Sequence, residues 1–398
     1  MLRRHGDAYR ASNAGHLDRS QRRVMGAIEA CRTAALGGHV ARCGDCGHTA
    51  ISYNSCRNRH CGKCQAGAAR EWLEARQADL LPVEYFHVVF TLPAPVAAIA
   101  FQNKAVVYAL LFEAAAATLK TIGADPRHLG AEIGATMVLH TWGQTLTHHP
   151  HIHCIVPGGG LALVPVAGGQ LKAHREAGKT WVQCRPGFFM PVRVLSRLYR
   201  RLFLEKLCAA HRVGTLKFFN DLAHLADPKA FAAAMAPLRR AEWIVFAKKP
   251  FAGPEQVLAY LSRYTHRIAI SNRRLTALDD THVAFNWRDY AHGSTTKIMR
   301  LDAHEFLRRF LLHVLPDGFQ RIRHYGFLAN GHRKAKLAAI RKLLAVAVAP
   351  AVIESGDDTS AAEAGETSLP CPCCGGPMTI IEFLPGPGHR RSPRLDTS

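Results

Sequence analysis

Apolar and polar positions along the chain follow patterns that predict helices and strands in mixed order. β-branched and aromatic residues dominate residues 85–92, which predicts a central strand that ends before Pro93. Residues 135–146 and 151–156 have the same character and flank turn-forming residues, so we expect a hairpin there. Further strands are expected at residues 215–219, 243–246, 267–270 and 282–287, and helices at residues 18–35, 66–81, 95–121, 191–210, 254–264 and 303–314. This order, with its hairpins, predicts an α+β fold.

Composition divides the chain into four parts. Residues 1–80 hold an arginine-rich helix and a cysteine-dense module, and residues 81–348 hold the predicted α+β domain. Residues 349–370 are rich in small and acidic residues and contain no Lys or Arg, which predicts a flexible acidic linker. Residues 371–398 begin with a C-x2-C pair, and their proline-rich end is expected to be disordered.

The charge balance indicates a polyanionic partner. The 398 residues are 48% hydrophobic, enough for a sizeable core, and they contain 51 Lys+Arg against 30 Asp+Glu, a net charge of +21. Arginine dominates the basic residues and suits bidentate phosphate contacts, so we expect nucleic acid as the partner. We find no apolar run of the length that a membrane span needs and no signal peptide, so we expect no membrane partner and a cytoplasmic location. The cysteines should then be reduced and free to bind metal.

Two cysteine knuckles predict a structural zinc site. Cys43 and Cys46 form one C-x2-C pair, and Cys61 and Cys64 form a second pair fourteen residues later. This spacing is close to that of four-cysteine zinc sites, and zinc would stabilise a segment too small for its own core. A different ligand set or a second ion stays open, because nearby candidates are in surplus: Cys56, His60, His48 and His39.

The remaining cysteines give weaker signals. Cys371 and Cys374 form a lone knuckle, and a closed zinc site there would need two more ligands, from His389 or from another chain. We expect ordinary buried thiols at the other positions: Cys31, Cys154, Cys184 and Cys208.

A histidine pair in the predicted hairpin indicates a second metal site. His151 and His153 lie two apart on a strand, so their side chains share one face and can bind one divalent ion. A four-residue turn at residues 147–150 would place Gln144 opposite His153, which makes Gln144 the expected third ligand, with His149 as the alternate. The same register would leave His140 about 13 Å away. An amide oxygen and two imidazoles predict Mg²⁺ or Mn²⁺.

A tyrosine pair provides candidate nucleophiles. Tyr260 and Tyr264 lie four apart on the predicted helix 254–264 and share one face. An ordinary core stripe has the same spacing. The surrounding cations favour a catalytic role instead, because they would attract a scissile phosphate: Arg263, Arg267, Arg273 and Arg274. A metal that polarises a phosphodiester and a phenol that attacks phosphorus would form a nuclease with a covalent phosphotyrosine.

Six motifs follow one another along the chain: YNSCRNRHC at residues 53–61, HVVFTLP at 87–93, HTWGQ at 140–144, HIH at 151–153, YLSRYTHR at 260–267 and RIRHYGF at 321–327. Together they resemble one known family, the rolling-circle insertion-sequence transposases of the HUH endonuclease class, founded by insertion sequence ninety-one. The resemblance spans about residues 20–345 and implies an antiparallel sheet that carries the metal. It also implies nicking of single-stranded DNA, with Tyr260 and Tyr264 matching the two-tyrosine form of the family.

The resulting hypothesis is a metal-dependent DNA transposase that leaves a 5′-phosphotyrosine and a free 3′-hydroxyl. Tyr264 is our choice for the first attack, and unwinding would depend on the host. We expect further cations to contact the DNA backbone: Arg321, Arg323, Arg333, Lys334 and Lys336. Two alternatives stay open, a replication initiator or relaxase with the same chemistry, and a zinc-containing DNA-binding regulator without catalysis.

Overall fold

The computed structural model describes residues 1–165, 171–172, 180–247, 256, 269–290, 292–344 and 370–386. The chain forms two compact units. The first comprises Met1–Gln65 and the described residues 370–386, and the second extends from Ala66 to Ala349. The structure therefore groups the C-terminal cysteine knuckle with the N-terminal unit, whereas the sequence predicted a separate tail.

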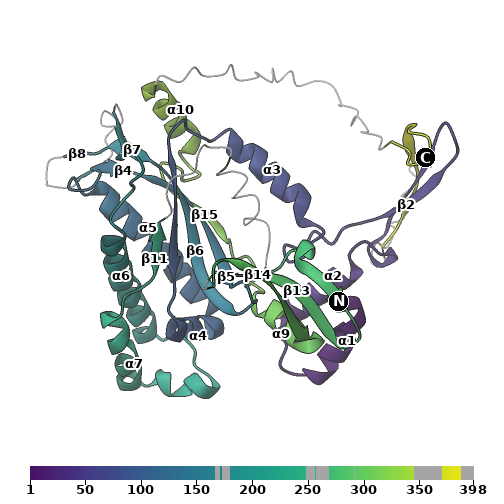
Figure 1. Cartoon of the computed structure of the whole chain (residues 1–398), viewed down its shortest axis with the longest axis horizontal. Helices are drawn as coiled ribbons and strands as arrows, with labels where there is room; N and C mark the ends of the chain where they lie inside the picture. Colours follow the sequence, from purple (N-terminus) through teal and green to yellow (C-terminus); the bar gives the residue numbers. More distant parts are fainter. Residues whose placement is uncertain are drawn as a thin grey trace, which may run out of the picture. The chain divides into compact units, whose positions relative to one another are not determined.

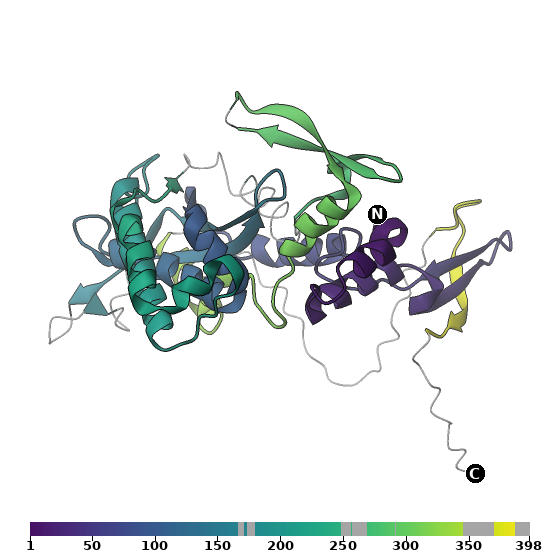
Figure 2. The same cartoon turned by 90° about the horizontal axis from the view of Figure 1, so that it is seen from below.

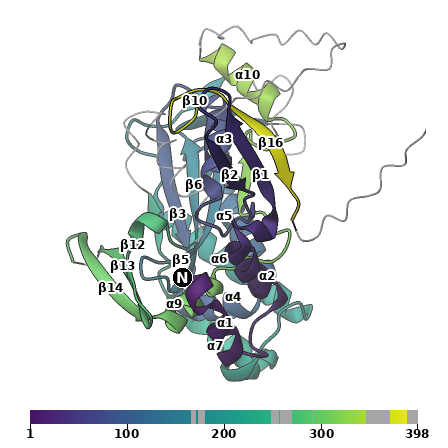
Figure 3. The same ribbon diagram turned by 90° about the vertical axis from the view of Figure 1, so that its right-hand side faces the viewer.

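The first unit contains two helices and a small sheet. Asp18 and Gln21 form a capping box at the start of the second helix, which fixes where that helix begins. The sheet is three-stranded and antiparallel, in the order β16-β1-β2, and Figure 3 shows β16 beside β1. The elements are α1 (Leu2–Ser12), α2 (Arg19–Ala30), η1 (Ala34–Leu36), β1 (Gly38–Cys43), β2 (Thr49–Tyr53) and β16 (Met378–Leu384).

A five-stranded sheet forms the centre of the second unit (Figure 1). Its order is β11-β3-β6-β5-β15, and every neighbouring pair is antiparallel. The strands are β3 (Tyr85–Thr91), β5 (Gly134–Trp142), β6 (His148–Pro157), β11 (Val245–Ala247) and β15 (Ile322–Gly326). The prediction of an α+β fold with an antiparallel sheet and an N-terminal zinc-binding module is confirmed.

Helices cover one face of this sheet. Phe90 of β3 packs on Tyr199, with ring centroids 4.9 Å apart, and Phe86 stacks on Phe189 at 5.2 Å. The covering helices are α4 (Ala94–Gln102), α5 (Lys104–Ala124) and α6 (Val192–Arg212). Because side chains alternate along a strand, His87, Val89 and Thr91 of β3 point to the opposite face.

The helix α5 is long and apolar. Within the described residues it is the one helix whose length and composition would allow it to cross a membrane. Of its most apolar window, 56% is buried inside the protein, and Leu111, Phe112 and Leu119 are among its buried side chains. This pattern is also that of a core helix.

The remaining elements surround the central sheet. Figure 2 shows β13 and β14 as a long antiparallel ribbon. These elements are α3 (Gln65–Gln77), β4 (Ala131–Glu132), β7 (Gly159–Ala162), β8 (Val164–Pro165), β9 (Leu171–Lys172), β10 (Trp181–Gln183), η3 (Asn220–Ala226), α7 (Pro228–Arg240), η4 (Asn272–Arg274), β12 (Leu275–Leu278), β13 (His282–Asp289), β14 (Thr295–Asp302), α9 (Ala303–Leu312) and α10 (Arg333–Leu343).

Most predicted elements are present, but the strand predicted at residues 215–219 is not, because side chains bind its backbone instead of a neighbouring strand. Residues 215–219 are not in a sheet. The backbone of Lys217 instead exchanges hydrogen bonds of 2.7 and 2.8 Å with the side chain of Asn103, and the backbone of Phe219 does the same with Gln102 at 2.9 and 3.0 Å. Side-chain amides thus replace the partner strand. The sequence did not predict β15 and α10, and most of the predicted helix 254–264 and strand 267–270 lies outside the described residues.

Candidate metal centre

The turn of the hairpin between β5 and β6 decides which residues meet. Residues 143–147 form this turn, closed by a hydrogen bond of 3.0 Å from the Gly143 N–H to the Thr147 carbonyl. The predicted turn at 147–150 lies too late, because β6 already begins at His148. In the observed register His151 lies opposite His140, and His153 lies opposite Val138. The predicted pairing of Gln144 with His153 is therefore wrong, as is the predicted distance of His140.

Three histidines converge on the face of the sheet opposite to α4, α5 and α6. His140, His151 and His153 each offer a ring nitrogen, and these atoms all lie within 4.8 Å of one another. The ring centroid of His140 is 4.3 Å from that of His153 and 5.4 Å from that of His151. His140 is buried, and the other two side chains are partly buried. Three neutral imidazoles at these distances can bind one divalent transition-metal ion.

Hydrogen bonds orient two of the imidazoles. Nδ1 of His151 donates to the His149 carbonyl at 2.7 Å, which leaves Nε2 free to bind a metal. Burial lowers the pKa of His151 to about 4, so this ring is neutral at pH 7. Nδ1 of His153 lies 2.7 Å from Nε2 of His87, and the two rings stack at 5.0 Å with only 5° between their planes. The sequence did not predict this contact of His87 with His153, although the HVVFTLP motif contains His87.

A pocket of about 550 Å³ opens over the three histidines. Gln144 lines it, but its side-chain oxygen accepts a hydrogen bond of 3.4 Å from the Arg288 N–H. His149, the alternate ligand, also lines the pocket and contributes its carbonyl to His151. His149 does not belong to the cluster of three histidine nitrogens. The third member of that cluster is His140, which lies opposite His151.

The tyrosine pair lies outside the described residues. This holds for Tyr260 and Tyr264, and also for Arg263 and Arg267. The described residues on both sides of this segment do line the pocket: Phe246 precedes it, and Ala269, Ile270 and Ser271 follow it. In the sequence, Tyr260 and Tyr264 therefore lie between two groups of residues that line the pocket.

The predicted DNA contacts are dispersed. Arg274 lines the pocket and donates to the Gln144 carbonyl, while Arg273 is exposed on the same short helix. Arg321 was predicted to contact the DNA backbone, but it is only 7% exposed and is therefore buried in this structure. Among the described residues, the other predicted cations do not line the pocket. Arg323 packs over the rings of Phe112 and Phe319. Arg333 forms an ion pair with Asp79 at 3.3 Å, Lys336 forms one with Glu132 at 2.7 Å, and Lys334 is exposed.

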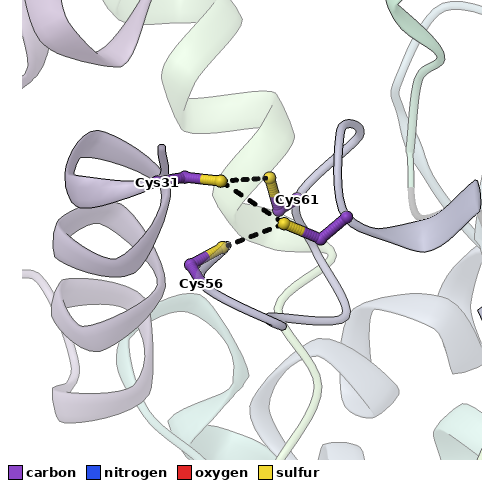
Figure 4. Close-up of side chains that lie close together, drawn as sticks. Cys31, Cys56 and Cys61 are labelled. Atoms are coloured by element: carbon purple, nitrogen blue, oxygen red, sulfur yellow. Dashed lines mark hydrogen bonds between the residues drawn. The ribbon is translucent and has the colours of Figure 1, made fainter. Parts of the chain in front are cut away.

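A four-cysteine cluster occupies the first unit (Figure 4). Its members are Cys31, Cys56, Cys61 and Cys64, whose sulfurs all lie within 4.8 Å of one another. Cys31 caps the C-terminal end of α2, and its sulfur lies 3.3 Å from that of Cys64. The expectation that Cys31 is an ordinary buried thiol is wrong. Four convergent thiols are the ligand set of structural zinc.

The predicted zinc site made of both N-terminal knuckles is also wrong. Cys43 ends β1 and Cys46 lies in the turn that follows, whereas β2 returns antiparallel to β1. The five residues of β2 therefore carry the chain about 16 Å back before Cys61 and Cys64. Cys43 and Cys46 lie instead beside Cys371 and Cys374.

Comparisons with known proteins identify the family of the chain. A family model described as "Putative transposase" matches residues 134–336, and one described as a transposase zinc-binding domain matches residues 1–92. The chain is 56% identical over 391 residues to the "Putative transposase y4qJ" of Sinorhizobium fredii (strain NBRC 101917 / NGR234), covering 97% of this chain and 95% of that protein. It is 28% identical over 315 residues to the transposase for insertion sequence element IS801 of Pseudomonas savastanoi pv. phaseolicola, covering 76% and 68% respectively.

Among solved structures, the chain is similar to the conjugative relaxase TrwC in complex with oriT DNA, in its metal-free form. The identity is 13%, the match covers 66% of this chain and 72% of that chain, and the TM-score of 0.20 is too low to carry an argument about the site. The family matches confirm the resemblance predicted from the motifs, and the zinc-binding domain agrees with structural zinc in the N-terminal unit. By sequence and domain content, this chain belongs to the IS91 family of transposases.

Proposed function

We propose that this transposase cuts single-stranded DNA at the ends of its element, with a metal ion at His140, His151 and His153 and a tyrosine as nucleophile. The observation that supports the proposal is the cluster of three histidines that lines one pocket. Phe246 and Ala269, which lie before and after Tyr260 and Tyr264 in the sequence, line the same pocket. Tyr264 precedes Ala269 by five residues, which is at most about 18 Å of extended chain.

The donor set favours a transition-metal ion. Imidazole nitrogens suit borderline metals, whereas Mg²⁺ prefers oxygen ligands. With His140 in place of Gln144, the set contains no amide oxygen, so we expect Mn²⁺ to support the reaction better than Mg²⁺. The bound ion would polarise the scissile phosphodiester and stabilise the leaving oxygen.

The tyrosine would supply the covalent step. Its phenol oxygen forms a bond to phosphorus as the bond from phosphorus to the 3′ oxygen breaks, and the phenol proton leaves with solvent or the departing hydroxyl. The products are a 5′-phosphotyrosine and a free 3′-hydroxyl. Joining this phosphate to another 3′-hydroxyl reverses the step and completes strand transfer.

The surroundings of the pocket suit a polyanionic strand. Arg274 is the cation of the described residues that lines it, and the chain as a whole carries a net charge of +21. We expect phosphate contacts there to weaken with salt. The substrate is single-stranded, so separation of the duplex would be left to host replication or helicase functions in the cytoplasm.

A covalent adduct with labelled DNA tests the proposal. The full chain is incubated with Mn²⁺ and labelled single strands that carry the element ends, and the adduct is separated under denaturing conditions. We expect an adduct with the wild type and none with the Tyr260→Phe/Tyr264→Phe double variant, while the two single variants show which tyrosine attacks first. Binding without an adduct would support the regulator alternative, and an adduct that persists in the double variant would contradict the proposal.

Tyr290 provides the matched control. It is 62% exposed and lines the same pocket, so its phenol is the rival nucleophile among the described residues. Tyr290→Phe retains the ring and removes the hydroxyl. We expect this variant to form the adduct at the wild-type level, and loss of the adduct would assign the attack to Tyr290 instead.

A further inference from the structure

We propose that Cys43, Cys46, Cys371 and Cys374 bind a second structural zinc ion, which completes a zinc ribbon assembled from the two ends of the chain. The four sulfurs lie within 4.8 Å of one another. The sulfurs of Cys43 and Cys374 are 3.5 Å apart, and those of Cys46 and Cys371 are 3.7 Å apart. Zinc–sulfur bonds of about 2.3 Å place tetrahedral ligands about 3.8 Å apart, so the cluster has the size of a four-cysteine site.

The backbone around the two knuckles has the same hydrogen-bond pattern. The Gly47 N–H donates to the Cys43 carbonyl at 3.2 Å, and the Gly375 N–H donates to the Cys371 carbonyl at 2.9 Å. The N–H of each first cysteine donates in turn to the carbonyl five residues later, at 2.9 Å to His48 and at 2.8 Å to Gly376. This equivalence does not depend on the position of any thiol.

Each knuckle also ends in the same special residue. Gly47 has a φ of 72° and Gly375 a φ of 78°, in the left-handed region that favours glycine. The sequence C-x2-C-G at both sites therefore encodes the same tight turn. Two such turns that face each other with their thiols converging are a matched pair of metal-binding loops.

Strand pairing positions the C-terminal knuckle against the N-terminal one. β16 is antiparallel to β1, with Cys43 opposite Met378 and Gly38 opposite Leu384. The Gly44 N–H donates to the Pro377 carbonyl at 3.2 Å, directly beside the cluster. The register of the sheet thus fixes the distance between the two pairs of cysteines.

The sheet has little other stabilisation. Along β2 and β16 most side chains are exposed, including Ile51 at 57%, Ile381 at 57% and Phe383 at 75%. A three-stranded sheet with so little buried apolar surface needs another source of stability. Four zinc–thiolate bonds would provide it, because metal binding to such a site is itself folding free energy.

The second site extends the zinc-binding domain beyond its recognised part. The family match covers residues 1–92 and therefore contains only two of the four ligands. Residues 370–386 supply the other two, so removal of the C-terminal segment would open this site and leave the Cys31 cluster complete. The C-terminal knuckle is thus a component of the N-terminal unit.

Zinc content of the full-length chain tests the inference. We expect Cys371→Ser/Cys374→Ser to contain one zinc ion fewer per chain than the wild type, measured by mass spectrometry of the metal after dialysis. Cys43→Ser/Cys46→Ser should lose the same single ion, and the quadruple variant should lose one ion, not two, because the knuckles share it. Cys373→Ser is the matched control: it lies in the same knuckle, is exposed and is outside the cluster, so its zinc content should not change.

Thiol reactivity in the wild type tests the site without any substitution. In the zinc-loaded chain we expect an alkylating reagent to modify Cys373 rapidly and to spare Cys371 and Cys374 until a chelator is added. Equal alkylation of all three before chelation, or unchanged zinc content in Cys371→Ser/Cys374→Ser, would overturn the inference.

Discussion

Replacing His140 with alanine gives the most direct test of the metal centre, because Gln144 provides a matched control nearby in the sequence. His140→Ala removes one of three imidazoles whose nitrogens lie within 4.8 Å of one another. Gln144→Ala removes a side chain that lines the same pocket but bonds to the backbone of Arg288. The two substitutions therefore separate a ligand from a residue of the pocket wall.

The magnitude follows from the number of ligands lost. Loss of the residue that hydrogen-bonds to a metal ligand typically lowers metal affinity 10–100-fold, and loss of the ligand itself should lower the affinity more. We expect His140→Ala to weaken Mn²⁺ binding at least about 100-fold, or about 2.7 kcal/mol, and Gln144→Ala by less than about tenfold, or about 1.4 kcal/mol. His140 is 2% exposed and stacks on Trp142 at 4.6 Å, so the substitution will also lower thermal stability.

Calorimetric titration of the full chain with Mn²⁺ measures the affinities. Thermal melting without metal separates a loss of ligand from a loss of fold, and the comparison is made at a temperature where both variants are folded. If Gln144→Ala weakens Mn²⁺ binding more than His140→Ala does, the assignment of the third ligand is wrong. Equal and small effects would indicate that the three histidines do not bind this metal.

Three further predictions concern His87, Cys56 and His148. His87→Phe keeps an aromatic ring but removes the nitrogen 2.7 Å from His153, so we expect Mn²⁺ affinity to fall about 10–100-fold, and an unchanged Mn²⁺ titration would contradict a positioning role. Cys56→Ser should lower the zinc content of the purified chain and its thermal midpoint, whereas Cys184→Ser, outside both clusters, should leave the zinc content unchanged. Burial lowers the pKa of His148 to about 4, so the folded state disfavours its protonation. The free energy of unfolding should therefore fall between about pH 6.5 and pH 4, by at most about 3 kcal/mol from this residue, and urea unfolding of His148→Phe should depend less on pH than that of the wild type.

Local sequence patterns predicted the parts of the site that depend on neighbouring residues. The alternation of side chains along a strand placed His151 and His153 on one face, and the structure retains that arrangement. The C-x2-C spacing likewise indicated cysteine pairs that can bind metal, and the structure places each pair in a four-cysteine cluster. The capacity of these histidines and cysteines to bind metal could therefore be predicted without any tertiary information.

The pairing of distant segments could not be read in the same way. Register in a hairpin depends on where the turn lies, and a turn only a few residues earlier than predicted places His140 opposite His151 and Val138, in place of Gln144, opposite His153. His87 reaches His153 because β3 pairs with β6, a contact between residues 66 positions apart. No local pattern encodes such a contact.

The sequence by itself determined the family, the α+β fold and the residue types that can bind metal, since these depend on composition and short spacings. The tertiary structure alone decided which histidine completes the triad and which knuckle faces which. The sequence predicted that the two N-terminal knuckles share one ion, whereas the structure places them in two different clusters. The antiparallel return of β2 separates Cys46 from Cys61, and the pairing of β16 with β1 brings Cys371 beside Cys46. Ligands that converge from distant parts of a chain are selected by strand pairing, and strand pairing is a property of the whole fold.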